Sequence, residues 1–431
     1  MLHIPDFLKK KPRDEDETPQ VQNVLLKYWL PISVGVLCLL LVCGYFLKVI
    51  LTDKSKVAPP AQSYDCCATV AAVGDISMSA KQLRTFRTDS GDYSFDNCFR
   101  QVAQSISAAD IAVGNLEGTL TNDIAKAQSN AYPVEYISAL ADCGFDLLQT
   151  ANSFSIQKGL SSIQLTMDAV EKFGMEALGT FRSPEERSEC GGVRIVDVNG
   201  IRIAFLAFTK GLNNMHLPDG SEYAVNLLFN DYDTEYSQIN ADGIIECINN
   251  AKNASPDFIF AMVHWGSENG TEINETQGQI ANLLIDNGVD VVLGSHSHIV
   301  GKIEKRPVLQ NDGSWKNTYI AYSLGDFMTA SEQSKTQYSC ILNLKLEKDS
   351  QTGAHAITEI SYTPTYCTSP SKSLGTSQYE VIDSLNAIQL RKEQYYNAVS
   401  ESLCDKLLQT LDALKEQTQT DYQIEKLYDG E

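Results

Sequence analysis

The sequence predicts a layered α/β protein, and three observations support that prediction. Short apolar runs typical of buried strands alternate with amphipathic stretches typical of helices. Asn199-Gly200, between two apolar runs, indicates a hairpin. The hydrophobic content of 43% and the charged content of 21% are those of a globular protein with a full core. Strands that alternate with helices favour layered α/β folds over all-α or all-β folds.

The first expected element is a membrane span at residues 28–47. The run from Tyr28 to Leu47 has no charged side chain, and about 20 apolar residues cross a bilayer core. Its apolar character goes all round the helix, whereas a core helix has an apolar stripe. The 27 residues ahead are long for a cleaved signal peptide, and no Ala-x-Ala-like site follows. We therefore interpret the run as a signal anchor.

Lysine and arginine residues predict the orientation of this span. More of them lie ahead of it, between Lys9 and Lys27, than just after it, between Lys48 and Lys56, and such residues concentrate on the cytoplasmic side. We expect a single-pass protein of the cell membrane with a cytoplasmic tail at residues 1–27. An extracellular stalk at 48–66 and the rest of the chain would follow outside the cell.

Seven apolar runs after the stalk predict the buried strands of one domain at residues 67–370. These runs are Ala68–Val73, Ile111–Val113, Phe145–Thr150, Ile201–Phe208, Phe258–Val263, Val289–Leu293 and Tyr319–Tyr322. Helices are expected between them, for example at Ile239–Ala251 and Gln277–Asn287.

Residues 371–431 predict one long amphipathic helix and a tail. Apolar residues from Val381 to Leu414 recur at steps of three and four, with one gap at Lys392. The helix is expected to pack against the domain, and the alternative is a partner-binding or coiled-coil helix. The formal net charge of −21 argues against a nucleic-acid partner, which would need a basic face.

Polar side chains follow six of the predicted strands, where ligands gather in α/β folds. They lie in Gly74-Asp75, Asn115-Leu116-Glu117, Asn152-Ser153, His264, His296-Ser297-His298 and Ser323-Leu324-Gly325-Asp326. Each alone is more often a turn, a helix cap or a packed aromatic pair. Their recurrence at one place in the pattern instead indicates a metal site. Oxygen and nitrogen donors without thiolates suit one or two ions of Mn, Fe or Zn.

The motifs that hold these residues resemble those of the CapA family of poly-γ-glutamate (capsule) synthesis proteins, of the calcineurin-like metallophosphatase superfamily. Similarity runs from about Thr69 to Pro364. The matching segments are Val73-Gly74-Asp75, Asn115-Leu116-Glu117-Gly118, His264-Trp265-Gly266-Ser267-Glu268, Gly288 to His298, and Tyr322-Ser323-Leu324-Gly325-Asp326-Phe327, where the family has Asn in place of Asp326.

The resemblance implies a four-layer α/β/β/α sandwich of the metallo-dependent phosphatase type, preceded here by the transmembrane helix. It implies a metal centre at the strand ends, and two sets of site residues follow by position. The implied metal ligands are Asp75, Glu117, Asn152, His264, His296 and His298. The residues expected to contact the substrate are Asn115, Trp265, Glu268 and Asp326.

One segment departs from the family. Where the family usually reads Ala-Asn-Asn-His-x-x-Asp-x-Gly, this chain has Phe154 for the His and Gln157 for the Asp. In related phosphatases that His protonates the leaving group, a role typically worth about 10²–10⁴-fold in rate. Phenylalanine cannot transfer a proton. His216 is the candidate replacement acid, and the alternative is a surface histidine without a catalytic role.

Two functions from different classes follow from these residues. In the first, the extracellular domain handles an anionic envelope polymer such as poly-γ-glutamate, beside partners of a polymer synthase or export complex. In the second, it is a metal-dependent hydrolase of a phosphoester or amide bond in the cell envelope. The loss of the His favours the first function, and the complete ligand set keeps the second open.

Overall fold

The computed structural model describes residues 64–121, 127–310, 313–331, 333–394 and 399–420. The chain divides into two compact units, Met1–Ser63 and Tyr64–Glu431, and all described residues belong to the second. The predicted span at residues 28–47 therefore lies outside the described residues. Within the described ranges, no helix has the length and apolar character needed to cross a membrane.

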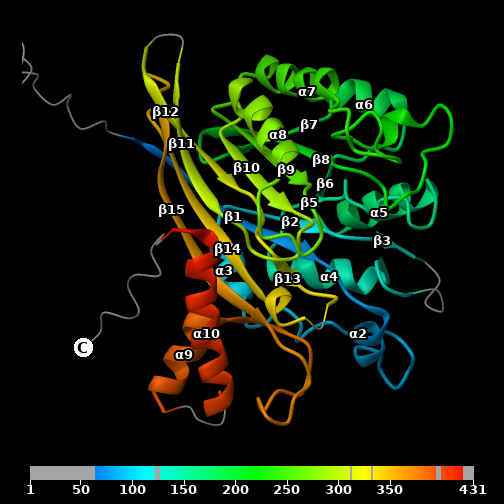
Figure 1. Cartoon of the computed structure of the whole chain (residues 1–431), viewed down its shortest axis with the longest axis vertical. Helices are drawn as coiled ribbons and strands as arrows, with labels where there is room; N and C mark the ends of the chain where they lie inside the picture. The colour runs from blue at the N-terminus through cyan, green and yellow to red at the C-terminus, as the bar shows by residue number, and fades with distance from the viewer. Residues whose placement is uncertain (1–63, 122–126, 311–312, 332, 395–398, 421–431) are drawn as a thin grey trace, which may run out of the picture. The chain divides into compact units, whose positions relative to one another are not determined.

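Two β-sheets form the centre of the second unit (Figure 1). The eight-stranded sheet has the order β16-β15-β14-β1-β2-β5-β6, with β13 beside β1. Its strands are β1 (Cys66–Ile76), β2 (Ile111–Leu116), β5 (Leu147–Gln149), β6 (Glu176–Leu178), β13 (Asp326–Met328), β14 (Tyr338–Lys348), β15 (His355–Cys367) and β16 (Val381–Asp383).

The six-stranded sheet has the order β11-β12-β10-β9-β8-β7. Its strands are β7 (Val193–Val198), β8 (Ile201–Thr209), β9 (Phe258–His264), β10 (Val291–Ser295), β11 (Ile303–Leu309) and β12 (Trp315–Ala321). All seven predicted strands are present. The predicted hairpin is also confirmed, because Asn199 and Gly200 have φ of 50° and 81°, the left-handed values that a tight β7–β8 turn requires.

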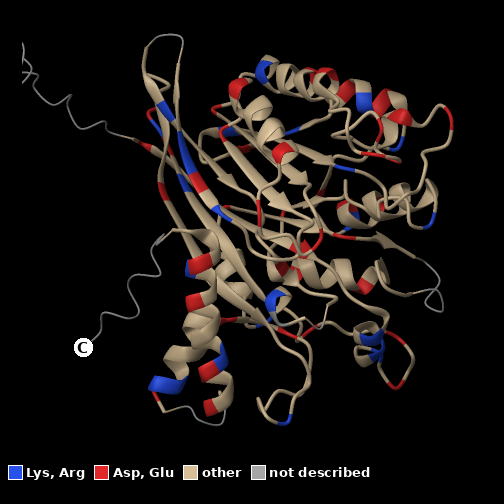
Figure 2. Ribbon diagram, viewed as in Figure 1, with Lys and Arg blue, Asp and Glu red and all other residues tan. Residues whose placement is uncertain are grey.

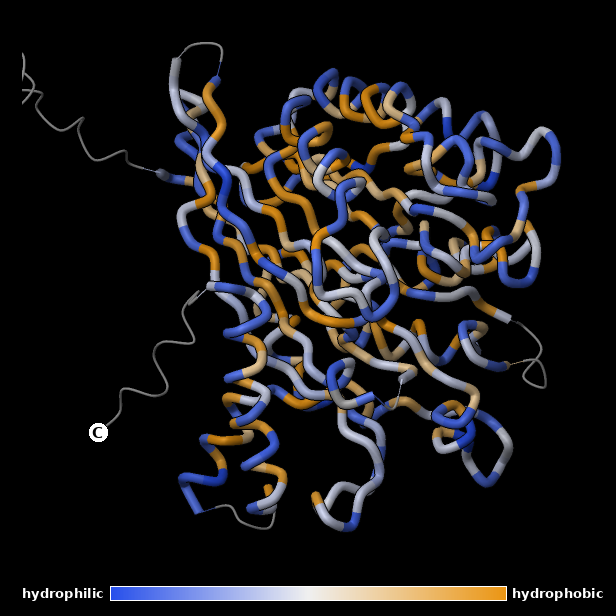
Figure 3. Tube along the Cα trace, in the orientation of Figure 1, coloured by the Kyte–Doolittle hydropathy of each residue, from blue (hydrophilic) through white to orange (hydrophobic). Residues whose placement is uncertain are grey.

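The central strands of each sheet are buried on both faces, which explains their continuous apolar runs. In β1, Ala71 and Val73 pack toward outer helices, whereas Val70 and Ala72 pack toward the other sheet. Successive side chains of a strand point to opposite faces, so one apolar run serves two layers of core. Hydrophobic residues accordingly follow the central strands, and hydrophilic ones lie on outer loops (Figure 3).

Helices cover the outer face of each sheet, which gives the layer order helix, sheet, sheet, helix (Figure 1). The helices on the eight-stranded sheet are α2 (Ala80–Thr85), α3 (Ala103–Ser107), α4 (Val134–Cys143) and α5 (Ser161–Lys172). The helices on the six-stranded sheet are α7 (Ala241–Asn253) and α8 (Glu275–Asp286). The short α6 (Pro184–Cys190) buries no side chain, and β3 (Thr119–Leu120) pairs with β4 (Ala131–Tyr132).

The C-terminal segment is not the single long helix that was predicted. It forms β16, then α9 (Ser384–Lys392), then α10 (Glu401–Thr418). The side chains of Asp383 and Ser400 cap the two helices, and α9 ends where the apolar stripe has its gap. Leucines of α10, including Leu403 and Leu407, are buried against the inner face of the eight-stranded sheet, where the second sheet does not cover it.

Gly294 in β10 permits a close approach of two chain segments. A Cβ there would lie 2.1 Å from the carbonyl oxygen of Tyr322 and 2.7 Å from the indole nitrogen of Trp265. Because the backbone cannot easily move aside, we expect Gly294→Ala to lower the free energy of unfolding by about 3 kcal/mol.

In the matched control Gly278→Ala, within α8, no atom lies within 4 Å of the new Cβ. That change should stabilise by up to about 1 kcal/mol. Denaturant unfolding measures both, and equal stabilities would contradict this account.

Candidate metal centre

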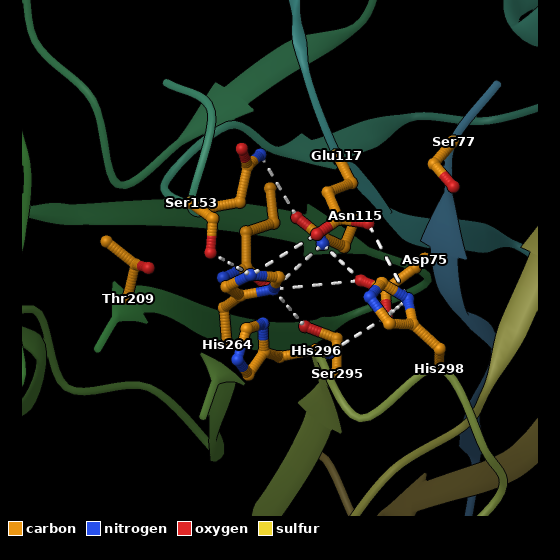
Figure 4. A network of polar contacts seen from close by, with 12 residues as sticks. Asp75, Ser77, Asn115, Glu117, Ser153, Thr209, His264, Ser295, His296 and His298 are labelled. Carbon is orange, nitrogen blue, oxygen red and sulfur yellow. Dashed lines mark hydrogen bonds and ion pairs between the residues drawn. The ribbon is translucent and has the colours of Figure 1, made fainter. Parts of the chain in front are cut away.

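Five side chains predicted at strand ends meet at one place (Figure 4). Asp75 lies in β1, Glu117 directly follows β2, and His264 ends β9. His296 and His298 follow β10. Figure 4 shows carboxylates and imidazoles from both sheets pointing toward one another. They converge because β1 and β2 are parallel neighbours in one sheet, as β9 and β10 are in the other.

A hydrogen bond joins the ends of the two sheets at this centre. The backbone N–H of His296 donates to Asp75 Oδ2 at 2.8 Å. Asp75 Oδ1 accepts a second bond, at 2.5 Å, from Asn115 Nδ2. Asp75, wholly buried in the eight-stranded sheet, is thereby fixed against the loop that carries the histidine pair.

The carboxylates and imidazoles form two adjacent groups of three. In one, the ligand atoms of Glu117, His264 and His296 all lie within 4.8 Å of one another. In the other, those of Asp75, His298 and Asp326 do so. The groups touch, since His264 Nδ1 lies 3.7 Å from Asp75 Oδ1 and His298 Nδ1 lies 3.8 Å from Glu117 Oε2. Two neighbouring groups of donors are what a two-ion centre requires.

Two features of the histidine loop indicate that these donors fit a divalent cation. The Nδ1 atom of His296 is buried and has no hydrogen-bond partner among the described residues, although buried polar atoms normally have one. His296 and His298 adopt φ of 89° and 61°, values that residues other than glycine seldom take and that cluster at functional sites. In the described part of the chain, no cysteine joins the cluster, so the set of donors suits Mn, Fe or Zn.

The charges of the cluster also favour a cation. Burial raises the pKa of Asp75 to about 6 and that of Glu117 well above its usual value, because each carboxylate loses its hydration. Burial lowers the pKa of His264 and His296 well below the usual range, which keeps both imidazoles in the neutral form that ligates metals. A divalent ion would compensate the crowded carboxylates and would give the buried Nδ1 of His296 a partner.

Asp326 lies with the candidate ligands, although it was expected to contact the substrate. Its Oδ1 is 2.8 Å from Nδ1 of His298. Burial alone would lower the pKa of His298, but the carboxylate of Asp326, with Glu117 and Asp75, outweighs it and raises this pKa to about 11. An Asp where the family has Asn therefore adds a negative charge directly to the centre.

Asn152 and Phe154 lie on the turn after β5. Asn152 Nδ2 donates to the carbonyl oxygen of Leu116 at 2.6 Å, and its Oδ1 accepts the Phe154 N–H at 3.0 Å. An amide oxygen keeps a second lone pair, so Asn152 can still ligate an ion. The same bond holds residue 154 beside this candidate ligand, where the phenyl ring supplies no proton.

Three other predicted site residues lie outside the two groups of donors. Trp265 is 1% exposed, its indole N–H donates to the carbonyl oxygen of Tyr322 at 2.9 Å, and the two rings stack. These contacts fit a packed aromatic pair. Glu268 is exposed on the loop after β9. His216 has a side chain that is 70% exposed and pairs with Asp233 at 2.5 Å, and that pair lies outside both groups of donors.

Sequence reasoning assigned no role to three polar residues around His264. The hydroxyls of Ser153 and Ser295 lie 3.0 Å from its Nε2 and 3.1 Å from its Nδ1 and so orient the ring. The backbone N–H of Lys210 donates to the carbonyl oxygen of His264 at 2.8 Å. Lys210 directly follows β8 at the same edge as the other site residues, and that position was the available signal.

Comparison with known proteins assigns the family. Residues 69–331 match the family described as bacterial capsule synthesis protein PGA_cap. The chain belongs to this family. The assignment made from the motifs is thereby confirmed over most of the expected range from Thr69 to Pro364.

Two relatives of this PGA_cap protein carry related names. The capsule biosynthesis protein CapA of Bacillus anthracis is 24% identical over 67% of this chain and 66% of its own length. The PGA biosynthesis protein CapA of Bacillus subtilis is 26% identical over 70% of this chain and 74% of its own length. The chain thus spans about two thirds of the first relative.

Solved structures similar to this PGA_cap protein are more distant. A phosphatase from Mycoplasma pneumoniae has 13% identity and a TM-score of 0.40, over 70% of this chain and 95% of its own. A protein described as a 5′-nucleotidase from Staphylococcus aureus has 11% identity and a TM-score of 0.42, over 74% of this chain and 54% of its own.

Proposed function

We propose that this protein binds an anionic polymer of the cell envelope at a metal centre of the metallophosphatase type, in the synthesis or export of poly-γ-glutamate or a related capsule. Family membership and the names of the relatives support the capsule context. One observation favours binding over cleavage. The metal-ligating side chains are assembled, but Phe154 occupies the position of the acid.

Electrostatics require a local positive charge for such binding. The chain has a formal net charge of −21, and Figure 2 shows Asp and Glu scattered over the outer helices. A polyanion approaching this surface is repelled unless a small region focuses positive charge. Two divalent ions held by the two groups of donors would bring four positive charges against the three carboxylates of Asp75, Glu117 and Asp326, and so would supply it. They would also coordinate the polymer's carboxylate or phosphate oxygens.

The proposal is tested by the equilibrium binding of fluorescent poly-γ-glutamate to the full-length protein in detergent, with Mn²⁺ or with chelator. We expect chelation, or the double change His296→Ala/His298→Ala, to weaken binding at least about tenfold through loss of charge-assisted contacts. The surface change His216→Ala is the matched control and should bind like the wild type. Metal-independent binding of equal strength in all samples would overturn the proposal.

A hydrolase acting on a phosphoester or amide bond is the second candidate. It is favoured by the Nδ1 of His296, which has no hydrogen-bond partner in the described part of the chain, and by the two groups of donors. Hydrolysis by such a centre would need a proton for the leaving group. Among the described residues, Phe154 has no proton to give, and His216, paired with Asp233, lies outside both groups of donors.

We further propose that residues 28–47 anchor the protein in the cell membrane with the domain outside, beside partners of a polymer synthase or export complex. The uncharged run and the lysines ahead of it support this topology. Protease added to intact cells should remove the domain and spare an N-terminal epitope. Full protection of the domain, with digestion only after lysis, would refute the orientation.

A further inference from the structure

A small pocket lies beside the candidate metal centre, at the ends of β8 and β9 and next to α8. Its volume is about 170 Å³. Residues that line it include Lys210, Tyr236, Trp265, Ser267 and Thr276. We call it the Lys210 pocket. Trp265 directly follows His264, and the Lys210 backbone is bonded to His264, so the pocket adjoins the metal centre.

Lys210 places an ammonium group in this pocket, and that group has hydrogen-bond donors that the protein does not use. Its Nζ donates to the carbonyl oxygen of Gly266 at 2.8 Å and lies 4.9 Å from the centre of the Tyr236 ring. An ammonium group has three N–H donors, and the protein engages one of them through Gly266. Within the described part of the chain, Lys210 forms no ion pair with a carboxylate. Burial lowers the pKa of Lys210, and the charge of the nearby Glu268 opposes that shift without a direct ion pair. The ammonium thus contacts a neutral carbonyl and a ring, and its remaining N–H donors are available to an anion.

The lining and the size of the pocket define the chemistry of that anion. Aromatic rings of Phe229, Tyr236 and Trp265 form apolar walls, and the side chains of Ser267 and Thr276 contribute hydroxyls. A volume of about 170 Å³ is well below the roughly 300–1,000 Å³ of sites for drug-sized ligands. One ammonium balances a single negative charge, whereas phosphate sites commonly use guanidinium forks or several donors. A carboxylate on a short aliphatic chain fits the apolar walls, the small volume and the single positive charge of this pocket.

We propose that the Lys210 pocket binds the free carboxylate of one polymer residue, next to the residue held at the metal centre. This inference rests on the proposed polymer-binding function and narrows it to polymers of small carboxylic acids. Two adjacent sites, one at the ion and one at Lys210, would fix the register of the polymer on the protein.

Glutarate, a short dicarboxylate, is a suitable probe, with inorganic phosphate as the competing chemistry. Calorimetric titration of the full-length protein should show glutarate binding that survives in the His296→Ala/His298→Ala variant, where the metal centre is disabled. Lys210→Met, of similar length without charge, should weaken glutarate binding about 10- to 100-fold. Lys210→Arg should retain most of the affinity, and phosphate should bind at least about tenfold more weakly than glutarate.

A second variant leaves Lys210 untouched. Thr276→Glu places a carboxylate at the pocket within the first turn of α8, where acidic residues stabilise a helix, so the protein should fold normally. It should weaken glutarate binding about tenfold by competing for Lys210. Unchanged affinity in both Lys210→Met and Thr276→Glu would overturn the proposal, as would glutarate binding that disappears with the metal centre. If either result were found while polymer binding still depended on metal, the proposed polymer-binding function would be kept and only the role of the Lys210 pocket would be rejected.

Discussion

Replacing His296 and His298 by alanine is expected to abolish metal binding by the full-length protein. The wild type should retain one or two divalent ions per chain after dialysis, and the double variant should show only the background of the buffer. The reason is geometric, because each histidine belongs to a different group of three donors. Elemental analysis measures the content, and His216→Ala, which changes an exposed histidine outside both groups, is the matched control.

Thermal unfolding gives an independent reading of the same site. Metal at 1,000 times its dissociation constant should stabilise the wild type by about 4 kcal/mol and leave the double variant unchanged. Retained metal also depends on pH, because protons compete for the ligand atoms. Burial raises the pKa of Asp75 to about 6. His298, whose pKa is raised to about 11, must also lose its proton before it can bind an ion, so affinity should fall steadily as the pH is lowered and more steeply below about 6. Equal metal content in the wild type and the double variant would exclude the site.

Phe154→His is expected to raise the hydrolysis of an ordinary phosphoester by about 10²–10⁴-fold, the usual contribution of a general acid. Residue 154 is held beside Asn152 by a 3.0 Å hydrogen bond, so the new imidazole would lie at the edge of the metal centre. Gln157→Asp is added to orient it. The gain should be smaller on an activated ester, whose leaving group needs little protonation.

Phe154→Ala is the control for this substitution, because it removes the ring and supplies no acid. It should not reproduce the gain. Rapid turnover of the ordinary ester by the wild-type protein would contradict the account, since another residue would then supply the proton. His216 would be the first to replace, and the hydrolase would become the better description of the protein.

The central strands could be predicted from the sequence because burial on both faces requires a continuous run of apolar residues. β8 and β9 are buried on both faces, and such strands appear as continuous apolar runs. The donors that end these strands were also predictable, since parallel neighbours bring their carboxyl ends together. β14 and β15 were harder to predict, because buried and partly exposed side chains alternate in the middle of each strand and interrupt the apolar run.

Other features depend on contacts between distant segments, which a single sequence does not reveal. The C-terminal stripe from Val381 was predicted as one helix because apolar spacing alone carries no sign of pairing with β15. The grouping of Asp326 with His298 arises from the parallel pairing of β13 with β1. The strained φ of the histidine pair and the orientation of Lys210 toward Gly266 likewise follow from tertiary packing.

The central claim is that the metal centre holds the polymer without cutting it. The length distribution of poly-γ-glutamate, measured by size-exclusion chromatography with light scattering after incubation with metal-loaded full-length protein, tests it most directly. The account predicts polymer that co-elutes with the protein and, once released by chelator, has its original length. Progressive shortening in the wild-type sample, absent in the His296→Ala/His298→Ala variant, would contradict the account and identify a hydrolase.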